Sequence, residues 1–213
     1  MKKTLYTKFI LAYVIFAFFG FLVVATFVSS MTFEHLKREK ANALYKEATL
    51  IANTYASDLY NNEVSIDTVQ KQLDALDTFL SASIWIINPS GRLVIDTSKP
   101  LDIDNPVIVN HFDPTITAGS YYTVGTFFGM FDEKTLSVFS PITSNYEVKG
   151  YVVIHTAISN LTDSANSLLT ISYILLVILF LLSLIILIFF TELVYLPLRM
   201  ITFATEQYAA GNL

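Results

Sequence analysis

Few residues in this 213-residue chain have the types and spacing that metal binding requires. Residues 102–105 read Asp-Ile-Asp-Asn and begin like a calcium-binding loop, but the next two residues lack the ligand and the turn glycine that such a loop needs. His111 and Asp113 are a second candidate pair, yet two ligands do not close a site, and a surface loop ending at Pro114 is the preferred interpretation. We therefore predict no metal site.

Catalytic motifs are also absent from the sequence. There is no glycine-rich phosphate loop, no His-Glu-x-x-His and no Gly-x-Ser-x-Gly, and the lack of cysteine excludes a thiol nucleophile. We assign no catalytic residue and no cofactor to this chain.

Aromatic side chains are the best candidates for binding a small molecule. Trp85, Tyr121, Tyr122 and Phe127 lie on or near predicted strands, where aromatic residues fit well and bury large areas. Most aromatic residues in such positions form plain core, so each of the four is either core or pocket wall. Arg92 follows a predicted turn and either pairs with a ligand carboxylate or stays a solvated surface charge. These five residues are the predicted ligand-binding set.

Two uncharged runs dominate the organisation of the chain. Residues 9–33 and 164–191 carry no charged side chain, and each run exceeds the roughly 20 apolar residues that a spanning helix needs. Lysines within residues 1–8 favour a cytoplasmic N-terminus. A cleaved signal peptide is the alternative, but its apolar core would be shorter. We predict a protein of the cell membrane, in contact with lipid, with both termini cytoplasmic and residues 34–163 outside.

The predicted outer segment is acidic. It has 16 acidic and 9 basic side chains, a net charge of −7 against −5 for the whole chain. This balance disfavours nucleic acid as a partner and mildly favours a basic ligand or a cation.

Periodicity in the outer segment predicts two helices. Apolar residues at 44, 48, 51, 55 and 59 form the stripe of an amphipathic helix that continues from the first membrane helix. A shorter helix should follow, with Asp67 as its N-cap and Gln70 as the capping partner.

Five strands are predicted after these helices, which makes the fold α+β with an antiparallel sheet. Asn88-Pro89-Ser90-Gly91 suits a type I turn between the first two strands. The last strand should run almost directly into the second membrane helix. The predicted strands are Ser83–Ile87, Leu93–Asp96, Tyr121–Phe128, Leu136–Pro141 and Val148–Thr156.

This order of elements resembles the extracytoplasmic PAS-like domains of bacterial receptors, which are also called Cache domains. The resemblance is carried by the helix pair, the strand around Trp85 and the Asn-x-x-Gly turn that follows it. It implies a small extracytoplasmic ligand held between sheet and loops.

The tail at residues 192–213 resembles the first helix of a HAMP domain, without the connector and second helix. Pro197-Leu198 and the final Gly211-Asn212-Leu213 match the family pattern. Proline is tolerated at a helix start and glycine closes a helix end. Leu198, Ile201, Thr205 and Tyr208 step by 3, 4 and 3 residues, as in the seam of a coiled coil. The resemblance implies a homodimer and signal transmission through Pro197, Gly211 and the seam residues.

Together the two resemblances imply the sensor part of a two-component sensor histidine kinase. Its histidines, His35, His111 and His155, all lie in the predicted outer segment, so none is the phosphoacceptor. ATP, magnesium and a response regulator would enter only through a kinase domain beyond these residues. The alternatives are the front half of a chemoreceptor or of another HAMP-linked protein, and a non-signalling envelope protein.

Overall fold

The computed structural model describes residues 3–61, 64–100, 105–117, 120–209 and 211. The chain divides into two compact units, each described by itself below. One unit holds Met1–Ser30 and Asn166–Leu213, and the other is Met31–Ala165.

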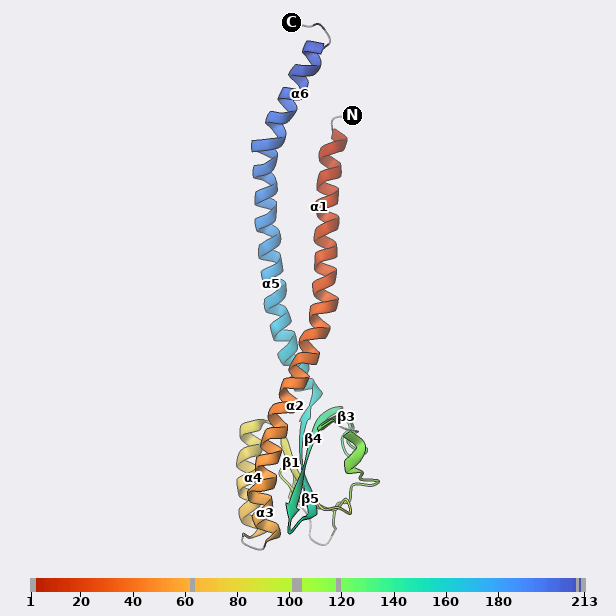
Figure 1. Cartoon of the computed structure of the whole chain (residues 1–213), viewed down its shortest axis with the longest axis vertical. Helices are drawn as coiled ribbons and strands as arrows, with labels where there is room; N and C mark the ends of the chain where they lie inside the picture. The colour runs from red at the N-terminus through yellow and green to blue at the C-terminus, as the bar shows by residue number, and fades with distance from the viewer. Residues whose placement is uncertain (1–2, 62–63, 101–104, 118–119, 210, 212–213) are drawn as a thin grey trace. The chain divides into compact units, whose positions relative to one another are not determined.

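The first unit contains the apolar parts of two long helical segments. Helix α1 spans Lys3–Val23 and passes through a π-helical turn at Val24–Val28 into α2. Helix α5 spans Ile158–Phe190 and passes through a second π-helical turn, Thr191–Tyr195, into α6, Leu196–Ala209. Both segments are long and apolar enough to cross a membrane (Figure 1). Most of their large apolar side chains are exposed. Tyr13 of α1 donates a hydrogen bond to the Ser183 hydroxyl of α5 at 2.6 Å.

The second unit begins with three helices. Helix α2 spans Ser29–Asn53, α3 spans Tyr55–Tyr60, and α4 spans Ile66–Leu80. The predicted stripe is therefore divided between two helices: its first three residues are buried in α2, and Tyr55 and Leu59 are partly buried in α3. The N-cap of α4 is Ser65, whose side chain accepts a hydrogen bond from the Thr68 amide, so the prediction of Asp67 as N-cap was wrong. Asp67 lies in the first turn instead, where its charge still complements the helix dipole.

Gln70 is therefore not a capping partner either. Its amide nitrogen donates to the Asp74 carboxylate at 2.9 Å and to the carbonyl of Asp96 at 3.1 Å. The second bond ties α4 to the edge of the sheet.

The five strands form one antiparallel sheet in the order β2-β1-β5-β4-β3, which confirms the predicted α+β class. Strands β1 (Ser83–Ile87) and β2 (Leu93–Asp96) have the predicted bounds, and the turn between them closes with the Gly91 amide donating to the Asn88 carbonyl. The remaining strands are β3 (Tyr122–Gly125), β4 (Thr135–Ser144) and β5 (Glu147–Ala157).

The ends of the later strands differ from the predictions for local reasons. Strand β3 stops at Gly125 because the backbone then turns, with positive φ at Phe127, Phe128 and Gly129. Strands β4 and β5 are longer than predicted because they meet in a two-residue hairpin, in which Asn145 and Tyr146 both have positive φ, as in a type I′ turn.

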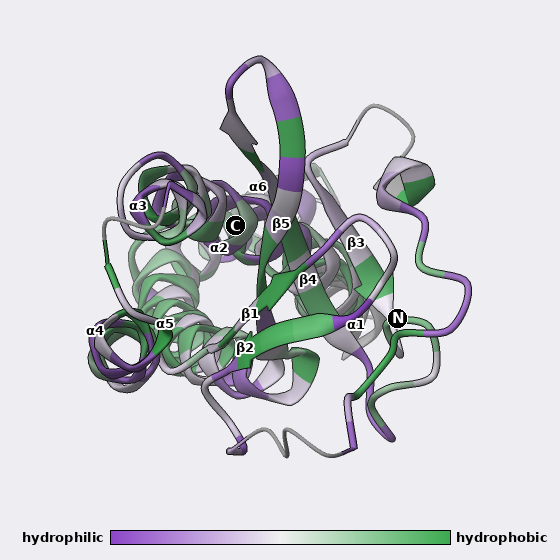
Figure 2. Ribbon diagram, turned by 90° about the horizontal axis from the view of Figure 1, so that it is seen from below, coloured by the Kyte–Doolittle hydropathy of each residue, from purple (hydrophilic) through white to green (hydrophobic). Residues whose placement is uncertain are grey.

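Both faces of the sheet are covered. Helices α2, α3 and α4 pack on one face (Figures 1 and 2). The side chains of the strands alternate between that face and the other. Ile84, Ile86, Val152 and Ile154 belong to the helix-covered core. Trp85, Ile87 and Val153 point the other way, into a second core beneath loops and turns. Consecutive apolar residues in β1 and β5 are explained by this two-sided burial.

The tail forms helix α6, Leu196–Ala209. The sequence suggested that Pro197 begins a separate helix. In the structure the helical backbone instead continues into Pro197 through the π-helical turn Thr191–Tyr195. A proline inside a helix removes one backbone donor and crowds the preceding turn, and a wider π turn accommodates this. Gly211 has φ +76°, the left-handed conformation expected after a helix end.

Candidate functional site

The most unusual group in the second unit is His155, which lies among aromatic rings. The centroid of its imidazole is 4.4 Å from Trp85, 4.4 Å from Phe127 and 4.9 Å from Phe131. Trp85 and Phe127 meet the imidazole at steep angles of 67° and 72°, the edge-to-face arrangement that aromatic rings favour. We call these four residues the aromatic chamber.

Two strands and one turn build the chamber. Trp85 lies on β1 opposite Val153 of β5, and His155 is two residues further along β5, so both side chains share the face away from the helices. Phe127 and Phe131 come from the turn after β3. That turn is closed by hydrogen bonds from the Met130 amide to the Phe127 carbonyl and from the Phe131 amide to the carbonyl of Thr126.

A short row of polar groups crosses the sheet beside the chamber. The Nδ1 atom of His155 lies 2.8 Å from the hydroxyl of Ser137 on β4. Ser137 lies 3.3 Å from the hydroxyl of Thr135, which donates to the Gly125 carbonyl on β3 at 3.0 Å. The row links β5, β4 and β3 below the surface.

The other imidazole nitrogen, Nε2, is buried without a hydrogen-bond partner among the described residues. Only 2% of His155 is exposed, and burial lowers the pKa of its imidazole to about 3. The cause is desolvation, which penalises the charged form of a buried base. The side chain is therefore neutral at ordinary pH.

Asp96 holds the tryptophan of the chamber in place. The indole nitrogen of Trp85 donates to the Asp96 carboxylate at 2.9 Å, and the Ser98 amide donates to the same oxygen at 2.8 Å. Asp96 is 6% exposed and lies directly opposite Trp85 in the β1–β2 pair. The chamber is thus tied to the edge strand of the sheet.

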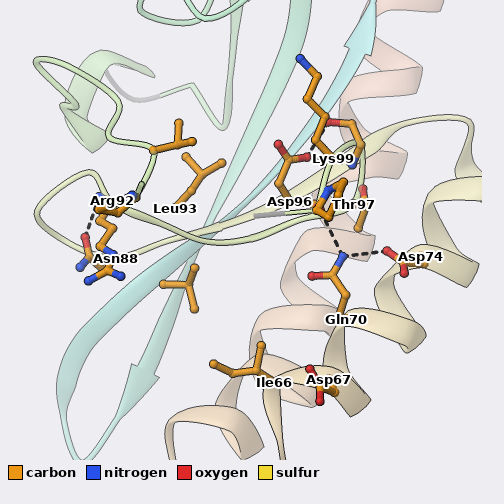
Figure 3. Close-up of a pocket in the computed structure, with 15 residues that line it drawn as sticks. Ile66, Asp67, Gln70, Asp74, Asn88, Arg92, Leu93, Asp96, Thr97 and Lys99 are labelled. Atoms are coloured by element: carbon orange, nitrogen blue, oxygen red, sulfur yellow. Dashed lines mark hydrogen bonds between the residues drawn. The ribbon is translucent and has the colours of Figure 1, made fainter. Parts of the chain in front are cut away.

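A separate, open cleft of about 770 Å³ lies between α4 and β2 (Figure 3). Asp67, Gln70 and Asp74 line it from the helix, whereas Arg92 lines it from the turn before β2 and Lys99 from the loop after β2. The lining thus contains side chains of both charge signs.

Several polar groups of the cleft already have partners within the protein. Gln70 bonds with Asp74 and with the Asp96 carbonyl, and the Asn88 carboxamide oxygen accepts from the amides of Ser90 and Arg92. The hydroxyl of Thr97 donates to the carboxylate of Asp77. The cleft offers space, whereas the chamber offers an unsatisfied polar atom.

The structure brings only two of the five predicted ligand-binding residues together. Trp85 and Phe127 share the chamber, with their ring centroids 5.6 Å apart. Arg92 lines the cleft. Tyr121 and Tyr122 lie elsewhere, since both pack on the helix-covered core.

Two important residues were not selected from the sequence. His155 was considered only as a phosphoacceptor, and Asp96 only as the end of a strand. The one available signal was position: His155 directly follows the apolar run Val152–Ile154, and Asp96 directly follows the apolar run Leu93–Ile95. A polar side chain buried at such a position must form a hydrogen bond or cost free energy.

The candidate metal ligands carry no site among the described residues, where no group of three His, Cys, Asp or Glu side chains comes together. The Asp113 carboxylate accepts hydrogen bonds from the amide and the hydroxyl of Thr115, and these bonds lower its pKa. Three residues of the calcium-like segment, 102–104, lie outside the described part of the chain.

The sheet connects to α5 without a loop. Strand β5 ends at Ala157, α5 begins at Ile158, and the Ile158 amide donates to the Lys134 carbonyl at 3.0 Å. His155 is therefore two residues from the end of the strand that becomes the helix.

Side chains of the predicted seam in α6 are exposed. Leu198, Ile201 and Tyr208 expose 57%, 63% and 73% of their surface, and the hydroxyl of Thr205 bonds back to the Ile201 carbonyl. The helix thus presents apolar side chains that none of the described residues buries.

No protein-family model and no curated protein matches this sequence. Among solved structures, the sensor domain of the V. cholerae histidine kinase DctB is similar with a TM-score of 0.50 and 16% sequence identity, over 69% of this chain and 60% of that one.

Two further structures are less similar. The extracellular domain of the histidine kinase vpHK1S-Z8 has a TM-score of 0.48 and 12% identity over 67% of this chain and 60% of that one. The ligand-binding domain of the Campylobacter jejuni chemoreceptor Tlp3, solved with 4-methylisoleucine, has a TM-score of 0.39 and 15% identity over 63% of this chain and 56% of that one. The second unit thus shares its helix-and-sheet fold with the DctB sensor domain, and the chain spans about three fifths of the length of that structure.

Proposed function

We propose that this chain is the sensing part of a membrane receptor of the sensor histidine kinase type. In this proposal the second unit lies outside the membrane, binds a small ligand, and passes its state inward. One observation carries the proposal: β5 becomes α5 with no intervening residue, so a change in the sheet moves the start of a helix long enough to cross the membrane.

The fold shared with the DctB sensor domain supports a sensing role for the second unit. Because this chain covers 60% of that structure, the activity of any whole protein is part of the proposal. The kinase domain, its ATP and magnesium, and the response regulator would all belong to residues beyond Leu213.

The tail supports the proposed output route. Leu198, Ile201 and Tyr208 are exposed apolar residues at coiled-coil spacing, and a second copy of α6 is the partner that such spacing fits. We therefore propose a homodimer in which α6 is the first helix of a HAMP domain. Pro197 lies in its first turn, and Gly211 follows its last residue.

The mechanism follows from a two-state equilibrium. The outer units exist in two arrangements at equilibrium. A ligand shifts this equilibrium by no more than the difference between its binding free energies for the two arrangements. A small slide or rotation of α5 then changes how the seam residues pack against their copies. Both termini are on the cytoplasmic side in this arrangement.

A chimera tests the proposal. Residues 1–213 are joined to the remainder of a well-behaved HAMP-linked kinase, and autophosphorylation is measured in membranes for the parent chimera and for Ile201→Glu. A buried unpaired charge costs several kcal/mol, so Ile201→Glu should lock one output state. The matched control is Met200→Glu, because Met200 is equally exposed in the single chain but lies off the seam. Equal activity of all three chimeras, with normal insertion and dimerisation, would exclude a transmission helix.

A further inference from the structure

The starting observation is the Nε2 atom of His155, which is buried and has no hydrogen-bond partner among the described residues. Buried polar side-chain atoms in folded proteins are nearly always paired. An orphaned one inside a wall of aromatic rings indicates that a partner belongs there.

The neighbouring hydrogen bonds determine what that partner must supply. The Thr135 hydroxyl donates its proton to the Gly125 carbonyl, so in its contact with Ser137 the serine is the donor. Ser137 has one proton, and its contact with His155 then requires Nδ1–H as the donor. The contacts Thr135–Gly125, Ser137–Thr135 and His155–Ser137 are all hydrogen bonds only when the imidazole proton is on Nδ1. Nε2 is left as a bare acceptor, so it needs a donor.

The walls of the chamber indicate the shape and charge of the missing partner. Trp85, Phe127 and Phe131 present aromatic rings to the imidazole, and Asp96 is the one Asp, Glu, Lys or Arg that is buried among the described residues. The carboxylate of Asp96 already accepts a hydrogen bond from the Trp85 indole. A flat, neutral molecule fits this lining, because a charged one would lose its hydration without gaining a counter-charge.

The protein's own rings occupy the space now. Phe127 is 4% exposed, whereas Phe128 and Phe131 in the same turn are only half-buried, so the turn lies at the surface with one ring inserted. Phe127 has φ +45° and Phe128 has φ +53°, a conformation that bulky residues rarely adopt. Such a backbone persists only when the surrounding packing holds it, and strain of this kind gathers at ligand clamps and switch regions.

We propose that the aromatic chamber binds a small neutral aromatic molecule with one hydrogen-bond donor, such as a phenolic hydroxyl, in place of the Phe127 ring. The donor pairs with Nε2 of His155, and the turn 126–131 swings outward as the ligand enters. The inference rests on the proposed function, because it makes the chamber the ligand site of the sensor. It also links the site to output, since His155 lies two residues before the end of β5.

The chain contains a built-in probe for this site. Trp85 is its single tryptophan and forms one wall of the chamber. The full chain, reconstituted in lipid nanodiscs, is titrated with p-cresol and with toluene, and Trp85 emission is recorded with excitation beyond the absorption band of both ligands. The two ligands differ only in the hydroxyl group.

The expected result is a saturable change with p-cresol and an affinity for toluene that is about tenfold weaker, the value of one hydrogen bond. The preference for p-cresol should vanish in His155→Leu. Phe127→Ala leaves the acceptor in place and removes the ring that the ligand would replace, so affinity for p-cresol should rise about tenfold or more. This second variant keeps the test decisive if His155→Leu does not fold.

Three outcomes overturn the inference. The first is equal affinity of the wild-type chain for both ligands, and the second is a preference for p-cresol that is retained in folded His155→Leu. The third is a non-saturating change of Trp85 emission that is identical in all variants, which would report partition of the ligand into lipid. Each leaves the proposed receptor function standing, because the chimera assay on Ile201 needs no ligand at the chamber.

Discussion

The indole nitrogen of Trp85 and the carboxylate of Asp96 form a buried hydrogen bond of 2.9 Å between two neighbouring strands. The bond joins the edge of the sheet to the chamber wall. It also sets the indole plane against which His155 and Phe131 pack.

Asp96→Ala should destabilise the second unit by about 1–3 kcal/mol, because it leaves a buried indole N–H unpaired. Asp96→Asn keeps an acceptor at the same place and should cost less. Urea unfolding followed through Trp85 emission measures both free energies. A smaller loss for the alanine than for the asparagine variant would contradict the role assigned to this bond.

Stability should also depend on pH through His155. The folded-state pKa is lowered to about 3 from an ordinary value of 6.5, so the unfolded chain binds more protons between these values. The stability contributed by the neutral imidazole is present above pH 6.5 and is lost as pH falls below it, by up to about 1.4 kcal/mol per pH unit.

Unfolding free energies between pH 7 and pH 5 test this slope. The carboxyl groups of Asp113 and Glu147, whose pKa values are lowered by hydrogen bonds, contribute mainly below this range. His155→Leu should flatten the pH dependence between pH 7 and pH 5. A variant with an unchanged slope would show that another group titrates.

Gly150 is a position where a side chain has no room. A Cβ atom there would lie 2.7 Å from the backbone carbonyl oxygen of Ile87 and 2.9 Å from the hydroxyl of Tyr60. Gly150→Ala should therefore cost about 1–3 kcal/mol through overpacking. Thermal unfolding of the two proteins gives the difference.

Tyr60 itself supplies a contrasting case. Its hydroxyl is buried without a partner among the described residues, and burial raises its pKa. Tyr60→Phe removes a polar group that gains nothing from burial, so stability should stay equal or rise. In the double variant Tyr60→Phe with Gly150→Ala, loss of the hydroxyl should relieve only part of the Gly150→Ala cost, because the clash with the Ile87 carbonyl oxygen is still present. A large loss for Tyr60→Phe alone would reveal a hydrogen bond to this hydroxyl.

The topology is testable because the chain has no cysteine of its own. A cysteine at Tyr146, the fully exposed tip of the β4–β5 hairpin, should react with a membrane-impermeant maleimide on intact cells. A cysteine at Thr4 should react only after the cells are opened. The reverse labelling would place the second unit in the cytoplasm.

Local signals in the sequence were enough for the helical spans, the α+β class and the first hairpin. The strands Ser83–Ile87 and Leu93–Asp96 were predicted with their exact bounds, because Asn88 and Gly91 specify a turn within four residues. The amphipathic stripe of α2 is likewise a property of one segment. The N-cap of α4 was missed by two residues because Ser65 and Asp67 are both good capping residues, and sequence alone does not rank them.

Only the tertiary structure decided what surrounds His155. Trp85 reaches it through the pairing of β1 with β5, Phe127 and Phe131 reach it through a turn with positive φ, and Ser137 reaches it across the β4–β5 pair. These contacts join residues that are far apart in the chain, and the side-chain period of two sends each to one face or the other depending on register. The strand register, and not the neighbouring residues in the sequence, therefore determines whether His155 has a hydrogen-bond partner and which of its two imidazole nitrogens is bonded.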